Sequence, residues 1–306
     1  MKKTLWALTL ALLFIICRPL FAKAETLPSI VATNFPCYDL ARQLCGDSAA
    51  IRMLLPPGSE SHSYEPTPQD LIALQNCDLF LYVGGESDAW VETLLESLGD
   101  QTPPAFRLCD QVALLAEERS ASMESHEHDE EEMDEHVWTS PKNMLRIVPA
   151  LANTLSRLFP QQAGFYAERR DGYVSKLEEL DAAFETVVQN GKRNLIVFGD
   201  RFPFRYFARD YGLRYDAAFP GCSEDSEPSV RTVISLVDTI RQQQIPVVFY
   251  IEFSSRRTAD ILAEETGAEE LLFHSCHNVS ADELAQGATY LTLMWHNVDA
   301  LKEALS

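Results

Sequence analysis

The sequence predicts an α/β protein of two lobes, each a small, mostly parallel β-sheet flanked by helices, joined by one long rigid linker helix. Short runs of β-branched and aromatic residues alternate with segments of helical periodicity, which is typical of parallel sheets with right-handed crossovers. Such units lie on both sides of one long amphipathic segment at 161–189, which favours two lobes over a single eight-unit barrel. With 306 residues, 46% of them hydrophobic, the chain can bury a sizeable core and is not disordered throughout.

Residues 1–24 are expected to form a signal peptide that is removed on export. Two lysines precede an apolar run at 5–17, and small residues at 22–24 supply a cleavage site. The run is too short for a good membrane span, and no later segment is apolar enough for one; an uncleaved anchor is the alternative. A lipid on Cys17 is not expected, because Ile16 is too bulky for the usual lipobox. The sequence therefore predicts a periplasmic protein.

The chain is strongly acidic, and this excludes some partners. It has 46 Asp and Glu against 25 Lys and Arg, a formal net charge of −21. The signal peptide holds four of the positive charges and no acid, so its removal takes the net charge from −21 to −25. Nucleic acid and an anionic membrane surface would repel such a protein, whereas a cationic ligand would not.

The N-terminal lobe is expected to span residues 25–160. Helices such as Thr67–Gln75 and Asp88–Leu98 fit between its strands. The strands are predicted at Ser29–Phe35, Ile51–Pro57, Asp78–Gly84 and Phe106–Val112.

The segment 161–189 is expected to link the lobes as one helix. It has an apolar stripe, no proline, and a single weak position at Gly172. At about 1.5 Å per residue it would be roughly 40 Å long, enough to run along both lobes and join them stiffly. An ordinary long surface helix of a single domain is the alternative. The stripe consists of Phe165, Tyr173, Leu177, Leu180, Phe184 and Val187.

The C-terminal lobe, residues 190–306, repeats the scheme of the first. Its clearest helix is Ser229–Gln243, in which valine and isoleucine recur at helical spacing. Its strands are predicted at Asn194–Phe198, Leu213–Phe219, Val247–Glu252 and Glu270–His274.

Six cysteines remain after the signal peptide. An even number in an exported protein allows up to three disulfides, although buried free thiols are equally compatible with the sequence. No CxxC pair occurs, which argues against a thiolate zinc knuckle. The six are Cys37, Cys45, Cys77, Cys109, Cys222 and Cys276.

Much of the acid lies in one loop at 116–135. Ten of these twenty residues are acidic and only Arg119 is basic, with almost no apolar content. His126 and His128 lie among the carboxylates, and imidazoles with carboxylates suit zinc-like cations. The loop is therefore either a solvated acidic segment or a weak metal-capture site.

Three of the seven histidines follow predicted strands. His62 follows Ile51–Pro57, His136 comes after the acidic loop, and His274 closes the last strand. The carboxyl ends of parallel strands carry the ligand sites of α/β folds, so these side chains would converge on a cleft between the lobes. Three histidines together favour a metal site. His296 is interpreted as structural, and His277 stays undecided.

Four segments of the sequence resemble the zinc/manganese ABC-transporter substrate-binding proteins, in particular the zinc-type members. The resemblance covers essentially the whole chain after the signal peptide, and a histidine-bearing acidic loop is typical of the zinc type. It implies two α/β lobes joined by one long helix. The matching segments are Pro56–Pro68, Glu135–Trp138 with Ser140–Asn143, Tyr206–Ala208 with Tyr211–Leu213, and Gly287–Tyr290 through Met294, Asn297 and Leu301.

Carried over by position, the family's metal ligands match only in part. His62 and His136 align with family histidines, and the fourth position, commonly Asp, falls on His274. The third position falls on Arg201, whose guanidinium does not deprotonate and cannot ligate a cation.

Asp200, Glu65 or a water could complete a tetrahedron with three histidines. Arg201 would then lie beside the ligands and pair with a nearby carboxylate, or form a structural salt bridge with Asp200.

The expected function is capture of Zn²⁺ in the interlobe cleft, without catalysis, and its delivery to an ABC importer. The family implies a membrane permease and an ATPase as partners, and the protein is expected to act as a monomer. Mn²⁺ or ferrous iron would favour more carboxylate than this site offers. A zinc hydrolase is a second class of function, but no HExxH-type helix is present and Glu65 is the only nearby candidate for a general base.

Overall fold

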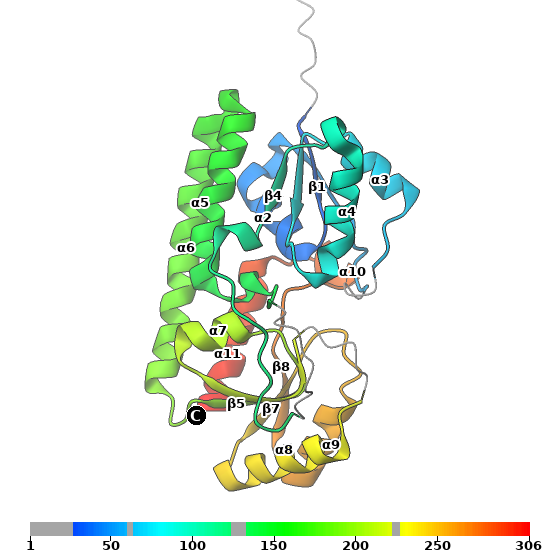
Figure 1. The fold of residues 1–306 in the computed structure, drawn as a ribbon. Helices are drawn as coiled ribbons and strands as arrows, with labels where there is room; N and C mark the ends of the chain where they lie inside the picture. The colour runs from blue at the N-terminus through cyan, green and yellow to red at the C-terminus, as the bar shows by residue number, and fades with distance from the viewer. Residues whose placement is uncertain (1–26, 60–63, 124–132, 222–226) are drawn as a thin grey trace, which may run out of the picture.

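The computed structural model describes residues 27–59, 64–123, 133–221 and 227–306 and has two lobes beside a pair of long helices (Figure 1). Each lobe contains a four-stranded, all-parallel sheet, with the strand orders β2-β1-β3-β4 and β6-β5-β7-β8. The two sheets thus share one topology, as expected for a repeated scheme. Among the described residues no helix is long and apolar enough to cross a membrane.

The N-terminal sheet forms where the sequence predicts it, with shorter strands. The inner strand β3 (Leu79–Tyr82) is buried along its whole length, which explains its unbroken apolar run. Its neighbours are β1 (Ser29–Ala32) and β4 (Ala105–Arg107), with β2 (Ala50–Met53) at the other edge. The helices are α2 (Phe35–Cys45), α3 (Pro68–Gln75) and α4 (Ala89–Leu98).

The C-terminal sheet is built on β5 (Leu195–Phe202), which continues beyond the predicted strand. Its register with β6 (Arg214–Pro220) shifts between Phe198 and Arg201, so the end of β5 is irregular. This irregularity carries Asp200 and Arg201 to the carboxyl edge of the sheet. The other elements are β7 (Val247–Tyr250), β8 (Glu269–Leu272), α7 (Arg205–Tyr211), α8 (Val230–Gln243), α9 (Arg257–Thr266), α10 (Ala281–Ala285) and α11 (Tyr290–Leu305).

The predicted linker helix is confirmed as α6 (Ala163–Asn190), which runs past both lobes in Figure 1. It buries most of the predicted stripe, from Tyr173 to Phe184, while Phe165 is exposed. The sequence did not reveal its partner: α5 (Pro141–Leu158) packs along α6, so the connection is a helical hairpin. Two packed helices are harder to bend than one.

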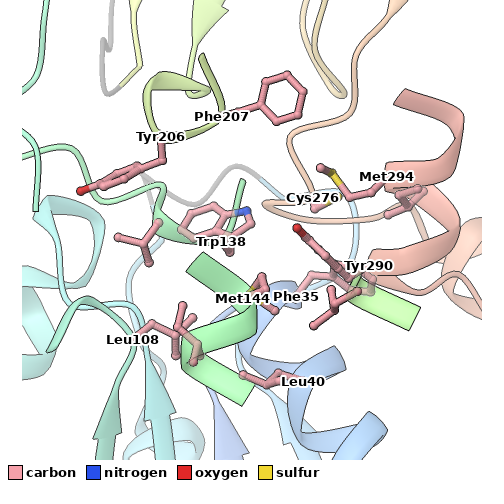
Figure 2. Close-up of a cluster of buried hydrophobic side chains, with 14 of the residues drawn as sticks. Phe35, Leu40, Leu108, Trp138, Met144, Tyr206, Phe207, Cys276, Tyr290 and Met294 are labelled. Atoms are coloured by element: carbon pink, nitrogen blue, oxygen red, sulfur yellow. The ribbon is translucent and has the colours of Figure 1, made fainter. Parts of the chain in front are cut away.

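One buried hydrophobic cluster continues through both lobes. It joins Leu81 of β3 to Phe198 of β5 by way of Trp138, and Figure 2 shows its central part. The first turn of α11 adds a polar contact, because the backbone N–H of Tyr290 donates to Asp39 of α2 at 2.9 Å. The lobes are therefore packed against each other rather than hinged at a single strand.

The five cysteines that the structure describes form none of the disulfides that the sequence allowed. Cys37, Cys45, Cys77, Cys109 and Cys276 are all buried free thiols, and Cys222 lies outside the described residues. Burial raises the pKa of each of these five thiols. They therefore act as small apolar side chains of the core.

Asp88 is a buried carboxylate in the loop after β3. It accepts hydrogen bonds from the backbone N–H groups of Val83 (2.7 Å) and Gly84 (3.1 Å). Burial, with a smaller contribution from the charge of Glu135, raises the pKa of Asp88 to about 7, although the hydrogen bond from the Gly84 N–H lowers it.

We expect Asp88 to make the metal-free protein less stable as pH rises. The pKa of Asp88 is about 7 in the folded protein and ordinarily 3.8, so folding favours the protonated carboxyl. The stability that this contributes is complete below pH 3.8 and is lost as the pH rises through about 7. Between about pH 5.5 and about pH 7.5 the free energy of unfolding should fall by about 2 kcal/mol on this account. Urea denaturation at both pH values should show a smaller fall for Asp88→Asn; equal falls in the two proteins would refute this role.

Candidate metal-binding site

His136 and His277 come from opposite lobes and line one small cavity. Their ring centroids are 5.5 Å apart and the rings are perpendicular. The cavity has a volume of about 30 Å³, which suits a single ion or water rather than an organic ligand. Its lining also includes Ser59, Arg201, Pro203, Gly221, Ile251, Glu252, Phe253, Ser275 and Asn278.

His136 is held by Asp134, two residues before it. The same carboxylate oxygen of Asp134 accepts from the His136 backbone N–H at 2.8 Å and lies 3.2 Å from ring atom Nδ1. A carboxylate accepts, so in the neutral ring the proton belongs on Nδ1 and the lone pair on Nε2. This is how a carboxylate orients a histidine ligand in metal sites. Burial lowers the pKa of His136, but Asp134 and then Glu135 outweigh it and raise the pKa above 6.5.

The backbone that carries Asp134 is fixed by both lobes. The hydroxyl of Tyr206, on α7, donates to the Asp134 carbonyl at 2.7 Å and accepts from the Leu115 N–H at 3.1 Å. The Asp134 N–H donates to the Leu115 carbonyl at 2.9 Å. On the other side, Glu135 accepts from the backbone N–H of Ser87 at 3.0 Å. His136 thus follows a turn whose position is set before any ligand arrives.

Trp138 connects the two histidines. It is fully buried, and its ring centroid lies 5.3 Å from that of His136 and 4.9 Å from that of His277. Its indole N–H donates to the Ser275 carbonyl of the C-terminal lobe at 2.8 Å. The indole therefore fills the space behind both rings and limits their movement.

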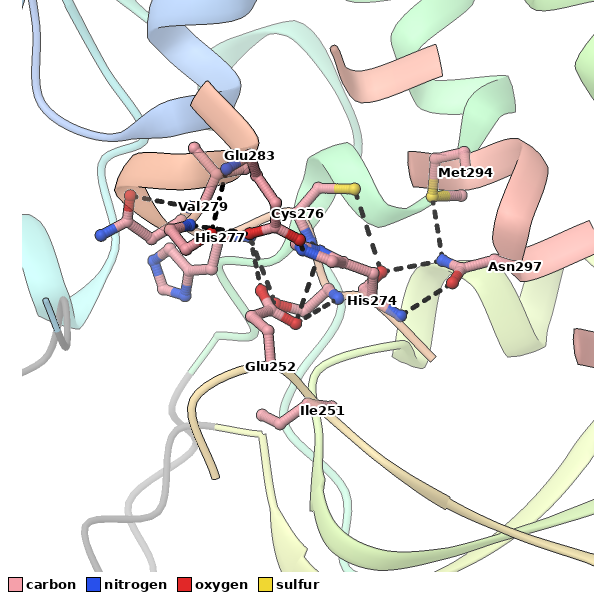
Figure 3. A network of polar contacts seen from close by, with 12 residues as sticks. Ile251, Glu252, His274, Cys276, His277, Val279, Glu283, Met294 and Asn297 are labelled. Carbon is pink, nitrogen blue, oxygen red and sulfur yellow. Dashed lines mark hydrogen bonds and ion pairs between the residues drawn. The ribbon is translucent and has the colours of Figure 1, made fainter. Parts of the chain in front are cut away.

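Glu252 holds the turn that carries His277, as Figure 3 shows. One carboxylate oxygen accepts from the Ser275 N–H at 2.7 Å, and the other accepts from the Ser275 hydroxyl at 2.5 Å and the His277 N–H at 3.2 Å. Glu252 also lies in the wall of the cavity. Glu252 was not predicted as a site residue from the sequence, although it follows strand β7 at the same edge of the sheet as the predicted histidine.

His274 does not line the cavity. Its Nδ1 accepts from the Cys276 N–H at 2.9 Å, and its Nε2 lies 3.9 Å from a Glu283 oxygen. Its backbone N–H and carbonyl both bond to Asn297, at 2.7 and 2.8 Å. Figure 3 shows His274 enclosed in this network, so of the two histidines His274 and His277 it is His277 that lies in the cavity wall.

Of the other predicted site residues that the structure describes, only Arg201 lies in the wall of the histidine cavity. Asp200 accepts from the backbone N–H groups of Arg201 (2.8 Å) and Ile251 (3.2 Å), and it lines a neighbouring cavity of about 360 Å³ rather than the histidine cavity. Arg201 lies in the walls of both cavities. Glu65 is exposed on the surface and lines neither of them.

Three predicted histidines cannot be placed. His62, His126 and His128 lie outside the described residues. Within the residues that the structure does describe, no three His, Cys, Asp or Glu side chains are arranged to hold a metal ion. A metal ion bound by His136 and His277 would therefore need at least one further ligand.

Two α/β lobes, each with a parallel sheet, and a small histidine-lined cavity between them are the architecture of a two-lobed substrate-binding protein. The chain belongs to the family described as "ZnuA: Zinc-uptake complex component A periplasmic", whose model matches residues 30–304. This is a family of extracytoplasmic metal-binding transport receptors and not an enzyme family.

Relatives with zinc in their names match most of the chain. The high-affinity zinc uptake system protein ZnuA of Bacillus subtilis is 30% identical over 283 residues, covering 90% of this chain and 87% of the relative. The zinc-binding lipoprotein AdcA of Streptococcus pneumoniae is 29% identical over 310 residues. The alignment covers 99% of this chain but 61% of AdcA, so the chain spans less than two thirds of that relative.

Solved structures share the fold. The Zn(II)-bound ZnuA-like domain of S. pneumoniae AdcA superposes with a TM-score of 0.77 at 27% identity, covering 91% of this chain and 99% of that domain. The metal-dependent lipoprotein YcdH of B. subtilis superposes with a TM-score of 0.78 at 27% identity, with 91% and 100% coverage. The predicted two-lobed fold is confirmed.

We expect Asp134→Asn to lower the pKa of His136. The carboxylate is the largest influence that raises this pKa, and burial, which lowers it, would remain. An NMR titration of histidine side chains in the metal-free protein measures the change. Asp171→Asn, at an exposed position on α6, is the control and should leave the His136 titration unchanged. An unchanged titration in Asp134→Asn would rule out this carboxylate as the cause.

Proposed function

We propose that the protein captures Zn²⁺ between its lobes and delivers it to an ABC importer. The observation that carries the proposal is the pair His136 and His277, which come from opposite lobes and line one cavity of ionic size. The family and the zinc-binding relatives support it.

The proposed ligands are His136, His277 and His62. His136 and His277 would offer neutral imidazoles, and His62 enters from the sequence, because its motif begins at the turn that brings Ser59 to the cavity. Glu252 or a water is proposed as the fourth ligand in place of Asp200 and Glu65, since Glu252 already lies in the cavity wall. His277 takes the role that the sequence assigned to His274.

Zinc is favoured over manganese by the donor set. Imidazole nitrogen suits Zn²⁺, whereas Mn²⁺ prefers sites rich in carboxylate and water. Protons compete with the metal for the imidazoles, so affinity should weaken in acid.

Delivery would require a membrane permease and a cytoplasmic ATPase as partners, with the receptor acting as a monomer. The α5–α6 hairpin and the continuous core would limit movement to small shifts of lobes or loops. The domains proposed are 25–160, the linker 161–189 and 190–306, because each sheet lies within one of the two lobes.

The location proposed is periplasmic, after cleavage of residues 1–24. Two of the relatives, AdcA and YcdH, are named lipoproteins, so the absence of a lipid on Cys17 stays a prediction.

The acidic loop is proposed as a collector of cations. Its described ends are joined by a β-bridge between Ala116 and Met133, and it leads directly to Asp134 and His136. Ions gathered by His126 and His128 would therefore be released close to the cavity.

We expect His277→Ala and His136→Ala each to weaken zinc binding by at least about tenfold, the scale of a lost ligand-shell interaction. Competition titration against a chromophoric chelator measures the affinity. His274→Gln, which alters a buried histidine in the same turn, should change zinc affinity much less while lowering stability. Loss of zinc affinity in His274→Gln with none in His277→Ala would restore His274 as the ligand.

A zinc hydrolase is the competing function, because three histidines can leave a coordination position open for water. Within the described residues Glu252 is the one glutamate in the cavity wall. Its carboxylate already accepts hydrogen bonds from the backbone of Ser275 and His277, so it is not placed as a general base. We therefore expect the zinc-loaded protein to cleave no ester, peptide or phosphate substrate. Turnover that disappears in His136→Ala would establish catalysis.

A further inference from the structure

We propose that Asn278 is a positioning residue for the metal site. Its side chain attaches the turn that contains His277 to the N-terminal lobe by hydrogen bonds. This inference rests on the proposed zinc site. Asn278 is buried, with 2% of its surface exposed, and lies in the cavity wall beside His277. It acts through the backbone that it holds and is not itself proposed as a ligand.

The Asn278 side chain binds three backbone groups. Its amide nitrogen donates to the carbonyl oxygens of Pro56 at 2.8 Å and Ser59 at 2.9 Å, both in the N-terminal lobe. Its amide oxygen accepts from the Val279 N–H at 2.8 Å. The Gly58 N–H adds a further bond across the lobes, to the Val279 carbonyl at 2.8 Å. Only an uncharged side chain with two donors and an acceptor can satisfy these groups together.

The N-terminal partner is a rigid turn. The Ser59 N–H bonds to the Pro56 carbonyl at 3.1 Å, and Gly58 has a φ of +80°. Pro57 followed by a glycine with positive φ is the pattern of a type II turn. Its conformation is therefore set locally, and Asn278 fixes where it stands relative to the C-terminal lobe.

The C-terminal partner is a strained turn. Cys276 has a φ of +59°, which non-glycine residues rarely adopt, and its N–H is held by Nδ1 of His274. Trp138 of the N-terminal lobe binds the Ser275 carbonyl on the other side of His277. His277 thus lies between two attachments to the N-terminal lobe, Trp138 before it and Asn278 after it.

The consequence is preorganisation of the metal site. With both sides of the turn attached, the spacing of His277 from His136 is set before zinc arrives, so binding costs little ordering of the chain. Loss of the Asn278 attachment should let the turn move and should act mainly on the rate of zinc release.

Asn278→Ala tests the proposal, with Asn297→Ala as the matched control. Asn297 is also a buried asparagine with two bonds to backbone groups of the same segment, but it lies on α11 and its bonds to His274 stay within the C-terminal lobe. Both variants should be less stable. Only Asn278→Ala should release zinc about tenfold or more faster in stopped-flow chelator competition, and only it should change the visible spectrum of the Co²⁺-substituted protein.

Hydrogen exchange on the metal-free protein separates this proposal from the proposed function. The Gly58 amide should exchange at least about tenfold faster in Asn278→Ala than in wild type, with no such change in Asn297→Ala. Asn278→Asp, which keeps the size and the acceptor but loses both donors, should do the same if the alanine variant fails to fold.

The opposing results are distinct. A wild-type protein that binds no zinc but shows the expected exchange pattern would refute zinc capture and leave the attachment standing. Unchanged Gly58 exchange in Asn278→Asp, or equal acceleration of zinc release in Asn278→Ala and Asn297→Ala, would overturn the positioning role.

Discussion

The hydrogen bond from the Trp138 indole to the Ser275 carbonyl joins the two lobes at the centre of the molecule. The indole is buried in the hydrophobic cluster that runs through both lobes, and it contacts both histidines of the cavity. A buried donor without a partner costs about 1–3 kcal/mol. Separation of the lobes here would therefore either expose the indole N–H to solvent or leave it buried without an acceptor. The same side chain therefore maintains the packing of the lobes and the spacing of the two imidazoles.

The fold could be predicted from the sequence because its determinants are local. Each strand is a short apolar run, and α6 is a long stripe without proline, so periodicity alone indicated both sheets and the linker. The helical hairpin could not be predicted in this way, because the packing of α5 along α6 depends on contacts between distant residues. The disulfides are a similar case: six cysteines have many possible pairings, and the five that are described all lie in the core as thiols.

The structure brings His136 near a histidine of the segment after β8, but that histidine is His277 and not the predicted His274. The sheet-edge rule located His136 and the segment after β8. It could not choose between His274 and His277, because β8 ends at Leu272 and the following turn reverses at Cys276, whose φ is positive. That reversal turns His274 into the Asn297 network and His277 toward His136. A side-chain direction that depends on one unusual backbone angle is not visible in spacing or composition.

Arg201 places a positive side chain in the wall of the proposed cation site. A guanidinium in the cavity wall would repel a dication bound there by several kcal/mol at an effective dielectric constant of about 20. Carboxylates farther away do little against this, because charges beyond about 10 Å are screened by salt. Among the described residues, Glu252 lies in the cavity wall and Asp134 contacts the ring of His136, so both carboxylates oppose this repulsion. In the proposed site these two carboxylates would favour a cation, and the overall charge would affect mainly the approach of the ion.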